Sequence, residues 1–595
     1  MRLKFLGGAR EVTGSSFLLD FGYKILVDCG MRQKEEEKIF LKEEVDAVLL
    51  THAHLDHSGL LPLLIKNNLL KGNVYSTPAT KEVASLLLFD AAKIQREDEE
   101  KGKKALFDEN DIVNLLKVWE TYDLNKQFSL GNARVKFLDA GHIIGSSQIL
   151  IEIEGIKILF TGDIGCGRSL LLNKPDVPKE HIDYLIIEST YGDREHPDKP
   201  PEEILYEEIT SLGDYSRILI PAFAVGRAQE IIYGLKLKGL DIPVFLDSPL
   251  AEKVAETYDY FLPYLKPEIK NKWKKMGEMF SIPHLEYVRS NKRSKELAED
   301  RKKKIVIAAS GMLEGGRVMN HLPHILKDEN AVLLFIGYQA EGTLGRKILE
   351  GERSVWIEDK EIEVKCSIKK IEGFSAHSDR RGLINFINNL PFYPSYIFIV
   401  HGEYETQKRF ADELRIQKFY PYIPSKEEEI DLKGGAREKI IIDFEKKFQK
   451  YGMYEIMLFT GGILKDDNLI RVISKEDLFE IINEEEKRLK HKEKVEIPVD
   501  IEKEEIESIT EEEFYRELKN MREEKILSKS KLQEFIENAS PGIDNLFSWI
   551  RITKNKIRFY PDKEKNDMVA EILLRGINSL REIAVSIAEK VLEET

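Results

Sequence analysis

Residues 51–57 read Thr-His-Ala-His-Leu-Asp-His and directly follow the apolar run Ala47–Leu50. The stretch places three imidazoles and one carboxylate within six residues at the end of a predicted strand. Neutral imidazole and carboxylate are preferred zinc ligands, and four such groups in one loop can serve two neighbouring ions. A single histidine is more often structural, but packing in a core does not explain a cluster this dense. The stretch therefore predicts a metal site at a strand end.

Three more residues of ligand type follow later strands. They are His142, Asp163 and His401, and each comes shortly after an apolar, β-branched run. Each also has a glycine beside it, which allows close approach of the backbone. Taken singly, each has an ordinary structural explanation. Together with residues 52–57 they complete two ligand sets that share one carboxylate.

The first 195 residues alternate short apolar runs with polar turns and helical patterns. Apolar positions at helical spacing predict a helix over Thr80–Lys104, and Phe21-Gly22 is a plausible hairpin turn. Two sheets with outer helices fit this order, which is that of an α/β sandwich. The predicted strands are Arg2–Leu6, Ser16–Asp20, Lys24–Asp28, Ala47–Thr51, Arg134–Asp139, Gln148–Ile153, Lys157–Thr161 and Tyr184–Glu188.

A second α/β unit is expected over residues 196–368. It contains four β-branched runs, each followed by a small-residue turn and a helical pattern, which is typical of a parallel, doubly wound sheet. The strand predicted at Ile397–Val400 resembles the first region again, so we expect the second unit to be inserted into the first. The first domain would then consist of residues 1–195 and 369–432. The four runs are Arg217–Pro221, Val244–Leu246, Ile305–Ala308 and Val332–Ile336.

The remainder of the chain has a different pattern. Residues 433–525 are expected to be a linker and charged segment, since 25 of the 41 residues from Glu484 to Glu524 are charged. Residues 526–595 are apolar enough to form a C-terminal α+β domain. A heptad-like stripe predicts a helical seam and a homodimer, although packing of the stripe on the extension's own strands is an equal alternative. The stripe is Leu573, Ile577, Leu580, Ala584, Ile587 and Val591.

Composition limits the classes of protein that fit. No run in the 595 residues approaches the apolar length of a membrane helix, so no membrane partner is expected. The three cysteines form no CxxC pair, which excludes a disulfide framework and a thiolate zinc knuckle and favours a cytoplasmic location. The net charge of −15 does not steer the chain to nucleic acid, so phosphate binding must come from a local patch or from metals.

The metal motif and three later segments together resemble a known family. The HxHxDH block with its downstream His, Asp and His is similar to the metallo-β-lactamase fold. The segments around Glu188, His377 and His401 resemble the further motifs of its β-CASP branch, which includes ribonuclease J and the endonuclease of the cleavage and polyadenylation specificity factor. The resemblance covers residues 1 to about 432. It implies an αββα sandwich with an inserted, doubly wound α/β cap domain; the C-terminal α+β extension lies outside it.

The resemblance also implies a role for each motif residue. Two Zn²⁺ ions per chain are expected, with Asp163 bridging them. Asp28 would orient ligand histidines from behind, and His377 would be the general acid, oriented by Glu188. The implied catalytic residues are therefore His377, Glu188 and Asp56. The first ion would be held by His52, His54, His142 and Asp163, and the second by Asp56, His57, Asp163 and His401.

These roles describe a zinc-dependent ribonuclease that acts on single-stranded RNA. Two ions about 3.5–4 Å apart clamp an in-line phosphoryl displacement. A protonated imidazole can supply the leaving 3′-oxygen with its proton, so the products are a 5′-phosphate and a 3′-hydroxyl. RNA-binding candidates are Arg227 and Arg317, at glycine-rich starts of cap helices, and Ser375 and Ser378 beside His377. The alternative for the glycine-rich segments is that they only shape tight turns.

Two other functions remain open from the sequence. DNA nucleases of the same branch typically have valine at the last motif, whereas this chain has His401, which favours RNA. A catalytically silent RNA-binding partner typically loses metal ligands, and this chain keeps all of them. Whether cleavage is internal or stepwise from an end does not follow from these residues.

Overall fold

The computed structural model describes residues 1–432 apart from 33–42 and a few shorter gaps, and beyond them only four short strands. The chain divides into two compact units, Met1–Gly434 and Gly435–Thr595. In the second unit, two antiparallel hairpins are described. The charged segment, the predicted seam helix and the 526–595 domain lie outside the described residues. The four strands are β23 (Phe448–Tyr451), β24 (Tyr454–Met457), β25 (Gly461–Asp466) and β26 (Leu469–Ser474).

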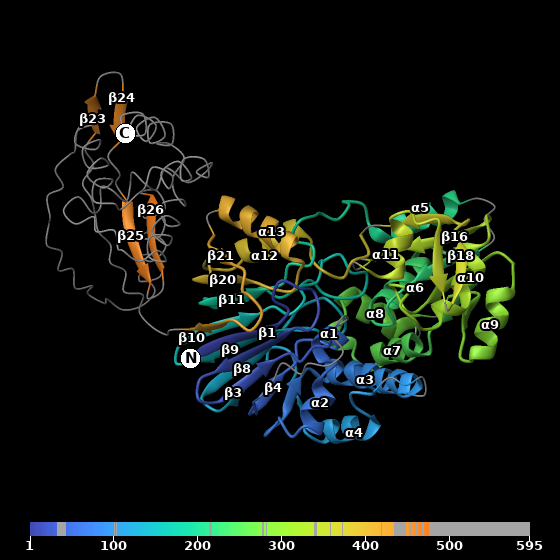
Figure 1. Ribbon diagram of the computed structural model, residues 1–595, viewed down its shortest axis with the longest axis horizontal. Helices are drawn as coiled ribbons and strands as arrows, with labels where there is room; N and C mark the ends of the chain where they lie inside the picture. Colours follow the sequence, from blue (N-terminus) through green and yellow to red (C-terminus); the bar gives the residue numbers. More distant parts are fainter. Residues whose placement is uncertain are drawn as a thin grey trace. The chain divides into compact units, whose positions relative to one another are not determined.

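Two seven-stranded sheets form the centre of the first unit (Figure 1). Between them lies one apolar core, to which Phe5 and Phe17 of the first sheet and Phe137 and Phe160 of the second contribute. The first sheet, in spatial order, is β22 (Glu429–Asp431), β1 (Arg2–Gly7), β2 (Ser16–Asp20), β3 (Lys24–Val27), β4 (Ala47–Leu49), β5 (Val74–Ser76) and β6 (Trp119–Thr121). The second is β21 (Pro421–Tyr422), β20 (Tyr396–Ile399), β11 (Tyr184–Ile187), β10 (Ile156–Phe160), β9 (Ser147–Ile153), β8 (Ala133–Asp139) and β7 (Gln127–Leu130).

Helices cover the outer face of each sheet, which gives the predicted αββα sandwich. Residues of α3 pack with the outward side chains of β2, β3 and β4, and those of α12 and α13 pack with β10, β11 and β20. Because side chains alternate along a strand, each sheet can serve both the central core and a helical layer. The helices are α1 (Leu55–Ser58), α2 (Leu61–Lys66), α3 (Pro78–Glu99), α4 (Glu109–Lys117), α12 (Arg380–Asn388) and α13 (Tyr404–Ile416).

The cap is built on a six-stranded sheet whose pairings are all parallel, as the sequence predicted. In spatial order its strands are β14 (Leu285–Tyr287), β13 (Val244–Asp247), β15 (Lys304–Ala308), β12 (Arg217–Pro221), β16 (Ala331–Phe335) and β19 (Ser367–Lys370). Helical elements pack on both faces. They are α5 (Pro201–Ser211), α6 (Arg227–Lys238), α7 (Pro249–Tyr260), η1 (Leu262–Tyr264), α8 (Pro267–Met276), α9 (Asn291–Glu299), α10 (Val318–Leu326) and α11 (Leu344–Leu349), with a hairpin of β17 (Ser354–Ile357) and β18 (Lys360–Glu363).

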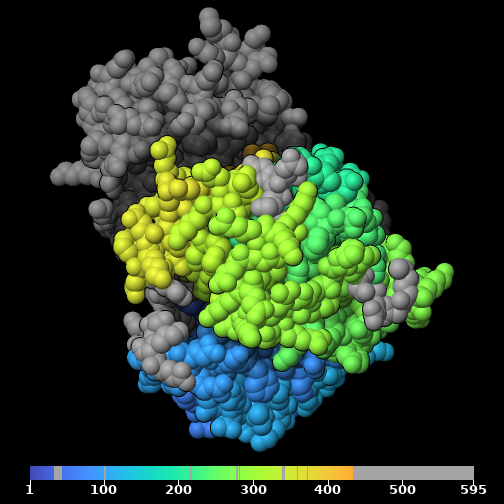
Figure 2. Space-filling view, turned by 90° about the vertical axis from the view of Figure 1, so that its right-hand side faces the viewer, coloured from blue at the N-terminus to red at the C-terminus, as the bar shows by residue number. Residues whose placement is uncertain are grey.

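The cap is an insertion between two neighbouring strands of the second sheet. Strands β11 and β20 pair in parallel, with Tyr184 opposite Tyr396, although the whole cap lies between them in the chain. The cap packs against the N-terminal part through α7 and α3, and Figure 2 shows it lying against the blue residues of that part. The predicted insertion is therefore confirmed.

Local differences from the predictions have physical causes. Helix α3 ends at Glu99 rather than at Lys104, and Gly102, at φ +90°, has a left-handed backbone that no helix continues through. Strand β4 ends at Leu49 rather than at Thr51, because the Thr51 amide donates to the Asp28 side chain instead of to a neighbouring strand. Among the described residues, no helix combines the length and apolar character that crossing a membrane requires.

Candidate metal centre

Four strand ends meet at one edge of the sandwich and bring the predicted ligands together. The HxHxDH block follows β4 and continues into α1; the other three ligands each follow a strand of the second sheet. These three are His142 after β8, Asp163 after β10 and His401 after β20. Donor atoms of three groups lie close enough within each group to hold an ion: His52/His54/His142/Asp163, Asp56/His57/His401 and Asp163/Glu188/His377/His401. The first two groups are called the donor sets below.

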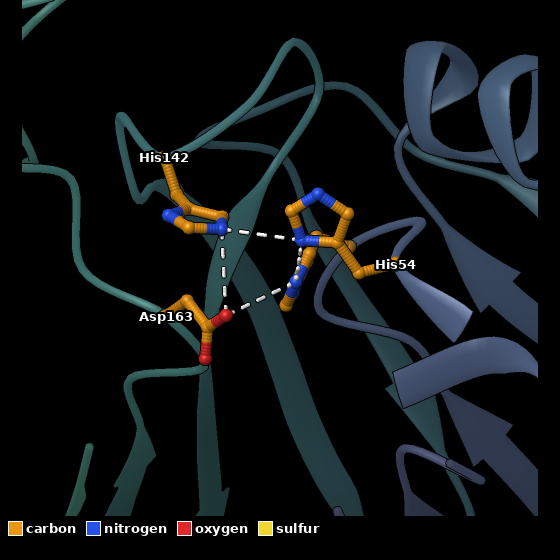
Figure 3. Close-up of side chains that lie close together, drawn as sticks. His54, His142 and Asp163 are labelled. Atoms are coloured by element: carbon orange, nitrogen blue, oxygen red, sulfur yellow. Dashed lines mark hydrogen bonds and ion pairs between the residues drawn. The ribbon is translucent and has the colours of Figure 1, made fainter. Parts of the chain in front are cut away.

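The first donor set has the spacing of a tetrahedral site. His54 Nδ1 lies 3.1 Å from His52 Nε2 and 3.3 Å from His142 Nε2. Asp163 Oδ2 lies 3.3 Å from His52 Nε2 and 3.4 Å from His142 Nε2. Figure 3 shows His54, His142 and Asp163 converging. Four donors about 2.0–2.1 Å from a tetrahedral zinc lie about 3.3–3.4 Å from one another, so these side chains fit the ion.

The second donor set uses the other oxygen of Asp163. Asp163 Oδ1 lies 3.3 Å from His57 Nε2, and His401 Nε2 lies 3.4 Å from Asp56 Oδ2. Among the described residues, Asp163 Oδ1 and His57 Nε2 are buried and have no hydrogen-bond partner. Buried polar atoms normally have a hydrogen-bond partner, so two such atoms that lie close together without one indicate a ligand that binds both. A shared cation satisfies both.

Carboxylate and hydroxyl groups behind the ligands fix the orientation of their rings. The Nδ1–H of His57 donates to Asp28 Oδ2 at 2.7 Å, and the Thr51 hydroxyl donates to the same oxygen at 2.8 Å. His52 Nδ1 lies 3.1 Å from the Thr51 hydroxyl. Engaging Nδ1 leaves Nε2 of both rings facing the donor sets. Asp28 itself has a left-handed backbone, φ +59°, which is uncommon for a residue with a side chain.

The His401 ring is held by Thr190, a residue two positions after Glu188 whose role no sequence spacing indicates. The Thr190 hydroxyl lies 2.9 Å from His401 Nδ1 and 3.2 Å from its carbonyl oxygen. The ring can donate to the hydroxyl while the hydroxyl donates to the carbonyl. His401 Nε2 is then directed at Asp56.

Burial keeps the imidazoles of the first set neutral. It lowers the pKa of His52 to about 3 and that of His54 to about 4, and lowers the pKa of His142 well below its usual value. A neutral ring keeps the lone pair that a metal needs. Burial would raise the pKa of Asp163, but His401 and the other histidines hold it well below its usual value. The set thus combines three neutral donors with one anion, which suits a divalent cation.

His377 and Glu188 form an ion pair beside the donor sets. His377 Nδ1 lies 3.0 Å from Glu188 Oε2 and 3.2 Å from Oε1. Glu188 is fully buried and also accepts from the Ile164 amide at 2.7 Å. Burial would lower the pKa of His377, but the carboxylates of Glu188 and Asp163 outweigh it and raise the pKa to about 9. Among the chain's own groups, His377 is therefore protonated at neutral pH.

Contacts from a distant loop position the His377 backbone. The buried His196 ring donates through Nε2 to the His377 carbonyl at 2.9 Å, and the His196 amide donates to Asp379 at 2.8 Å. An isolated bridge joins Gly165, two residues after Asp163, to His377. His196 was not identified from the sequence, because nothing near residue 196 marks it as a partner of residue 377.

The four RNA-binding candidates have different surroundings. Arg317 Nη1 donates to the Ser290 carbonyl at 2.9 Å and lies 3.3 Å from Asp247, so its guanidinium is bound within the cap. Ser375 and Ser378 are buried, and the Ser375 hydroxyl accepts from the His377 amide at 3.2 Å. Arg227 differs from these three: its Nε and Nη1 are buried and have no hydrogen-bond partner among the described residues.

Family models match most of the first unit. Residues 9–206 match the metallo-beta-lactamase superfamily, residues 228–348 the Beta-Casp domain, and residues 361–424 the Zn-dependent metallo-hydrolase RNA specificity domain. Together with the fold and the donor sets, these matches define a metal-dependent hydrolase of the metallo-β-lactamase type.

Similar proteins match about seven tenths of the chain. Ribonuclease TTHA0252 of Thermus thermophilus is 36% identical over 68% of this chain and 94% of its own length. An RNase J-like protein of Methanocaldococcus jannaschii is 34% identical over 70% of this chain and 97% of its own. Transcription termination factor FttA of the same organism is 34% identical over 73% of this chain and 72% of its own. The chain belongs to the β-CASP family of the metallo-β-lactamase superfamily.

Proposed function

We propose that the protein is a zinc-dependent ribonuclease that hydrolyses phosphodiester bonds of single-stranded RNA in RNA processing or decay. The observation that carries the proposal is the pair of donor sets sharing Asp163, with the His377–Glu188 pair beside them. Two relatives that carry ribonuclease or RNase J in their names, and the match to an RNA specificity domain, support RNA as the substrate.

Two Zn²⁺ ions are proposed to occupy the donor sets. When bound, they would supply positive charge for the phosphodiester oxygens and make water a nucleophile near neutral pH. The chain's part is to hold seven donor side chains in place and to keep their rings oriented through Asp28, Thr51 and Thr190. The first ion would lie among His52, His54, His142 and Asp163, and the second among Asp56, His57, Asp163 and His401.

His377 is proposed to be the general acid. The carboxylates of Glu188 and Asp163 raise its pKa and so favour the protonated ring, and Nδ1 is engaged by Glu188, so Nε2 is the nitrogen available to a leaving 3′-oxygen. Glu188 is a positioning residue that also retains the proton on the ring. His196 holds the His377 carbonyl, and with it the backbone that carries the acid. Proton donation to the 3′-oxygen leaves a 3′-hydroxyl and a 5′-phosphate.

The alternatives are a DNA nuclease and a silent RNA-binding subunit. Against the silent subunit stands the complete set of donors at suitable spacing. Two observations disfavour a DNA nuclease. The chain has His401 where DNA nucleases of the branch typically have valine, and residues 361–424 match an RNA specificity domain. A reducing, cytoplasmic location is proposed because Cys29, Cys166 and Cys366 are all free thiols.

The test uses the full-length protein with zinc and one sequence offered as linear RNA, circular RNA and single-stranded DNA, each labelled. We expect cleavage of RNA, products that a ligase accepts as 5′-phosphorylated, and little cleavage of DNA. The His377→Ala variant should be nearly inactive, and the His284→Ala variant, which alters an exposed histidine of the cap, should match the wild type. Equal cleavage of RNA and DNA would favour the DNA nuclease, and RNA binding without cleavage would favour the silent subunit. Cutting of the circle would show internal cleavage.

A further inference from the structure

We propose that Arg227 forms a subsite of the cap that binds a backbone phosphate of the RNA close to the scissile bond. The proposal rests on the proposed ribonuclease function and deepens it. It assigns to one partly buried arginine the task of joining the cap to the substrate, which the metal ligands and His377 do not perform.

The start of α6 lies against the metal-ligand loops. Arg227 is the first residue of α6 and follows Gly226, whose φ is +76°. A Cβ on Gly226 would lie 3.0 Å from the side chain of Ile143, the residue after the ligand His142. Glycine therefore serves a close approach here, and that approach brings the cap helix to the loop that carries a metal ligand.

A second contact fixes the same face of α6 to the segment that follows Asp163. Glu230, three residues after Arg227 and so on the same helix face, accepts from the Leu170 amide at 2.8 Å and from the Ser169 hydroxyl. The same segment contains Cys166, whose amide donates to the Ala376 carbonyl beside His377 at 2.9 Å. Arg227 is therefore held where the cap, the Asp163 segment and the His377 loop meet.

Among the described residues, no carboxylate forms an ion pair with the guanidinium of Arg227. Its Nε and Nη1 are buried without a hydrogen-bond partner among the described residues. The Glu230 carboxylate, the acidic group on the same face, is already taken by Ser169 and by the Leu170 amide. Arg317, by contrast, has Ser290 and Asp247 as partners. A buried charge without a partner is unfavourable for folding, so a site that keeps one indicates a ligand of opposite charge.

A phosphate oxygen pair fits this group. Nε–H and Nη–H of one guanidinium form a fork that matches the spacing of two phosphate oxygens. RNA offers such a phosphate at every nucleotide, and the net charge of −15 does not attract it, so binding needs local cations. A local, partly buried cation near the loop that carries His142 therefore both attracts the strand and positions it.

The experiment measures RNA binding in the full-length, inactive His377→Ala background, with Arg227→Met, Arg227→Lys or Arg289→Met added. We expect Arg227→Met to weaken binding of labelled single-stranded RNA about 10- to 100-fold and to reduce the slope of log affinity against log salt by about 0.7. Arg227→Lys should recover part of the affinity, because lysine keeps the charge but not the fork. Arg289→Met, which removes an exposed cap arginine paired with Glu252, should bind like its parent.

A thermal melt separates binding from a structural role. Arg227→Met removes two buried guanidinium nitrogens that have no hydrogen-bond partner among the described residues. Its melting temperature should therefore equal or exceed that of the parent, and added inorganic phosphate should stabilise the parent more than the variant. Unchanged RNA affinity and salt slope in Arg227→Met would overturn the proposal, and so would a large fall in its melting temperature. If the His377→Ala parent itself binds no RNA, the proposed function fails, and this inference fails with it.

Discussion

Removal of His377 should separate catalysis from metal binding. Its ring nitrogen Nδ1 lies 3.0 Å from Glu188 but 3.9 Å from Asp163 Oδ2, farther than the 3.3 Å and 3.4 Å that separate this oxygen from the histidines of the first donor set. His377→Ala therefore leaves both donor sets intact. Loss of a positioned proton donor costs about 10²- to 10⁴-fold in turnover. We expect a fall of that size with an unchanged zinc content.

Removal of Asp163 should have the opposite signature. Its two oxygens serve both donor sets, with Oδ2 3.3 Å from His52 and Oδ1 3.3 Å from His57. Asp163→Ala leaves each set with three donors and removes the anion common to both. We expect loss of zinc from both sites together with loss of activity, since zinc sites depend on four ligands.

Two measurements on purified full-length protein test both variants. One is the zinc content per chain by mass spectrometry, and the other is the single-turnover cleavage of labelled RNA. His284→Ala, which changes an exposed histidine, is the control for both readouts and should match the wild type. Loss of zinc from His377→Ala, or two zinc ions retained by Asp163→Ala, would refute this division of roles.

Three further predictions concern pH, substrate and assembly. The folded pKa of His377, about 9, lies above its ordinary 6.5, so the Glu188–His377 pair stabilises the fold below pH 6.5 and loses its effect as pH rises through 9. The measurement is the free energy of unfolding in urea, for chelator-treated wild type and Glu188→Gln. The wild type should be more stable by at most about 3 kcal/mol at pH 6 and by little at pH 10. A difference that does not change with pH would contradict the stabilising effect of the pair. Single-stranded RNA should be cleaved faster than its perfect duplex, because ligands such as His52, His142 and Asp163 are buried and a rigid duplex cannot bring one phosphodiester to them; equal rates would contradict this. Deletion of residues 445–595 should convert a dimer to a monomer in light scattering, and a monomeric full-length chain, or a dimeric truncated one, would exclude the C-terminal extension as the dimer contact.

Much of the metal centre could be predicted from the sequence, because its signals are local. The HxHxDH block and the glycine-flanked His142, Asp163 and His401 each follow a strand, and strand ends in such a sandwich meet at one edge. Alternating small-residue turns and β-branched runs likewise indicated the parallel cap sheet, and a late strand indicated the insertion.

The remaining contacts join residues that no spacing relates. Thr190 contacts His401, and His196 contacts the His377 carbonyl, although the inserted cap separates the partners of each pair in the sequence. Nor does a sequence show whether an arginine has a partner. Arg227 and Arg317 both follow glycine-rich segments at the start of cap helices. Only the folded chain shows that Arg317 is bound within the cap, whereas two guanidinium nitrogens of Arg227 are buried with no hydrogen-bond partner among the described residues.

The most direct test of the two-metal site is anomalous X-ray diffraction at the zinc edge from crystals of the zinc-loaded, full-length protein. Two peaks about 3.5–4 Å apart are expected, with Asp163 between them. One should contact His52, His54 and His142, and the other Asp56, His57 and His401. A single peak, or peaks away from Asp163, would contradict the two-metal site.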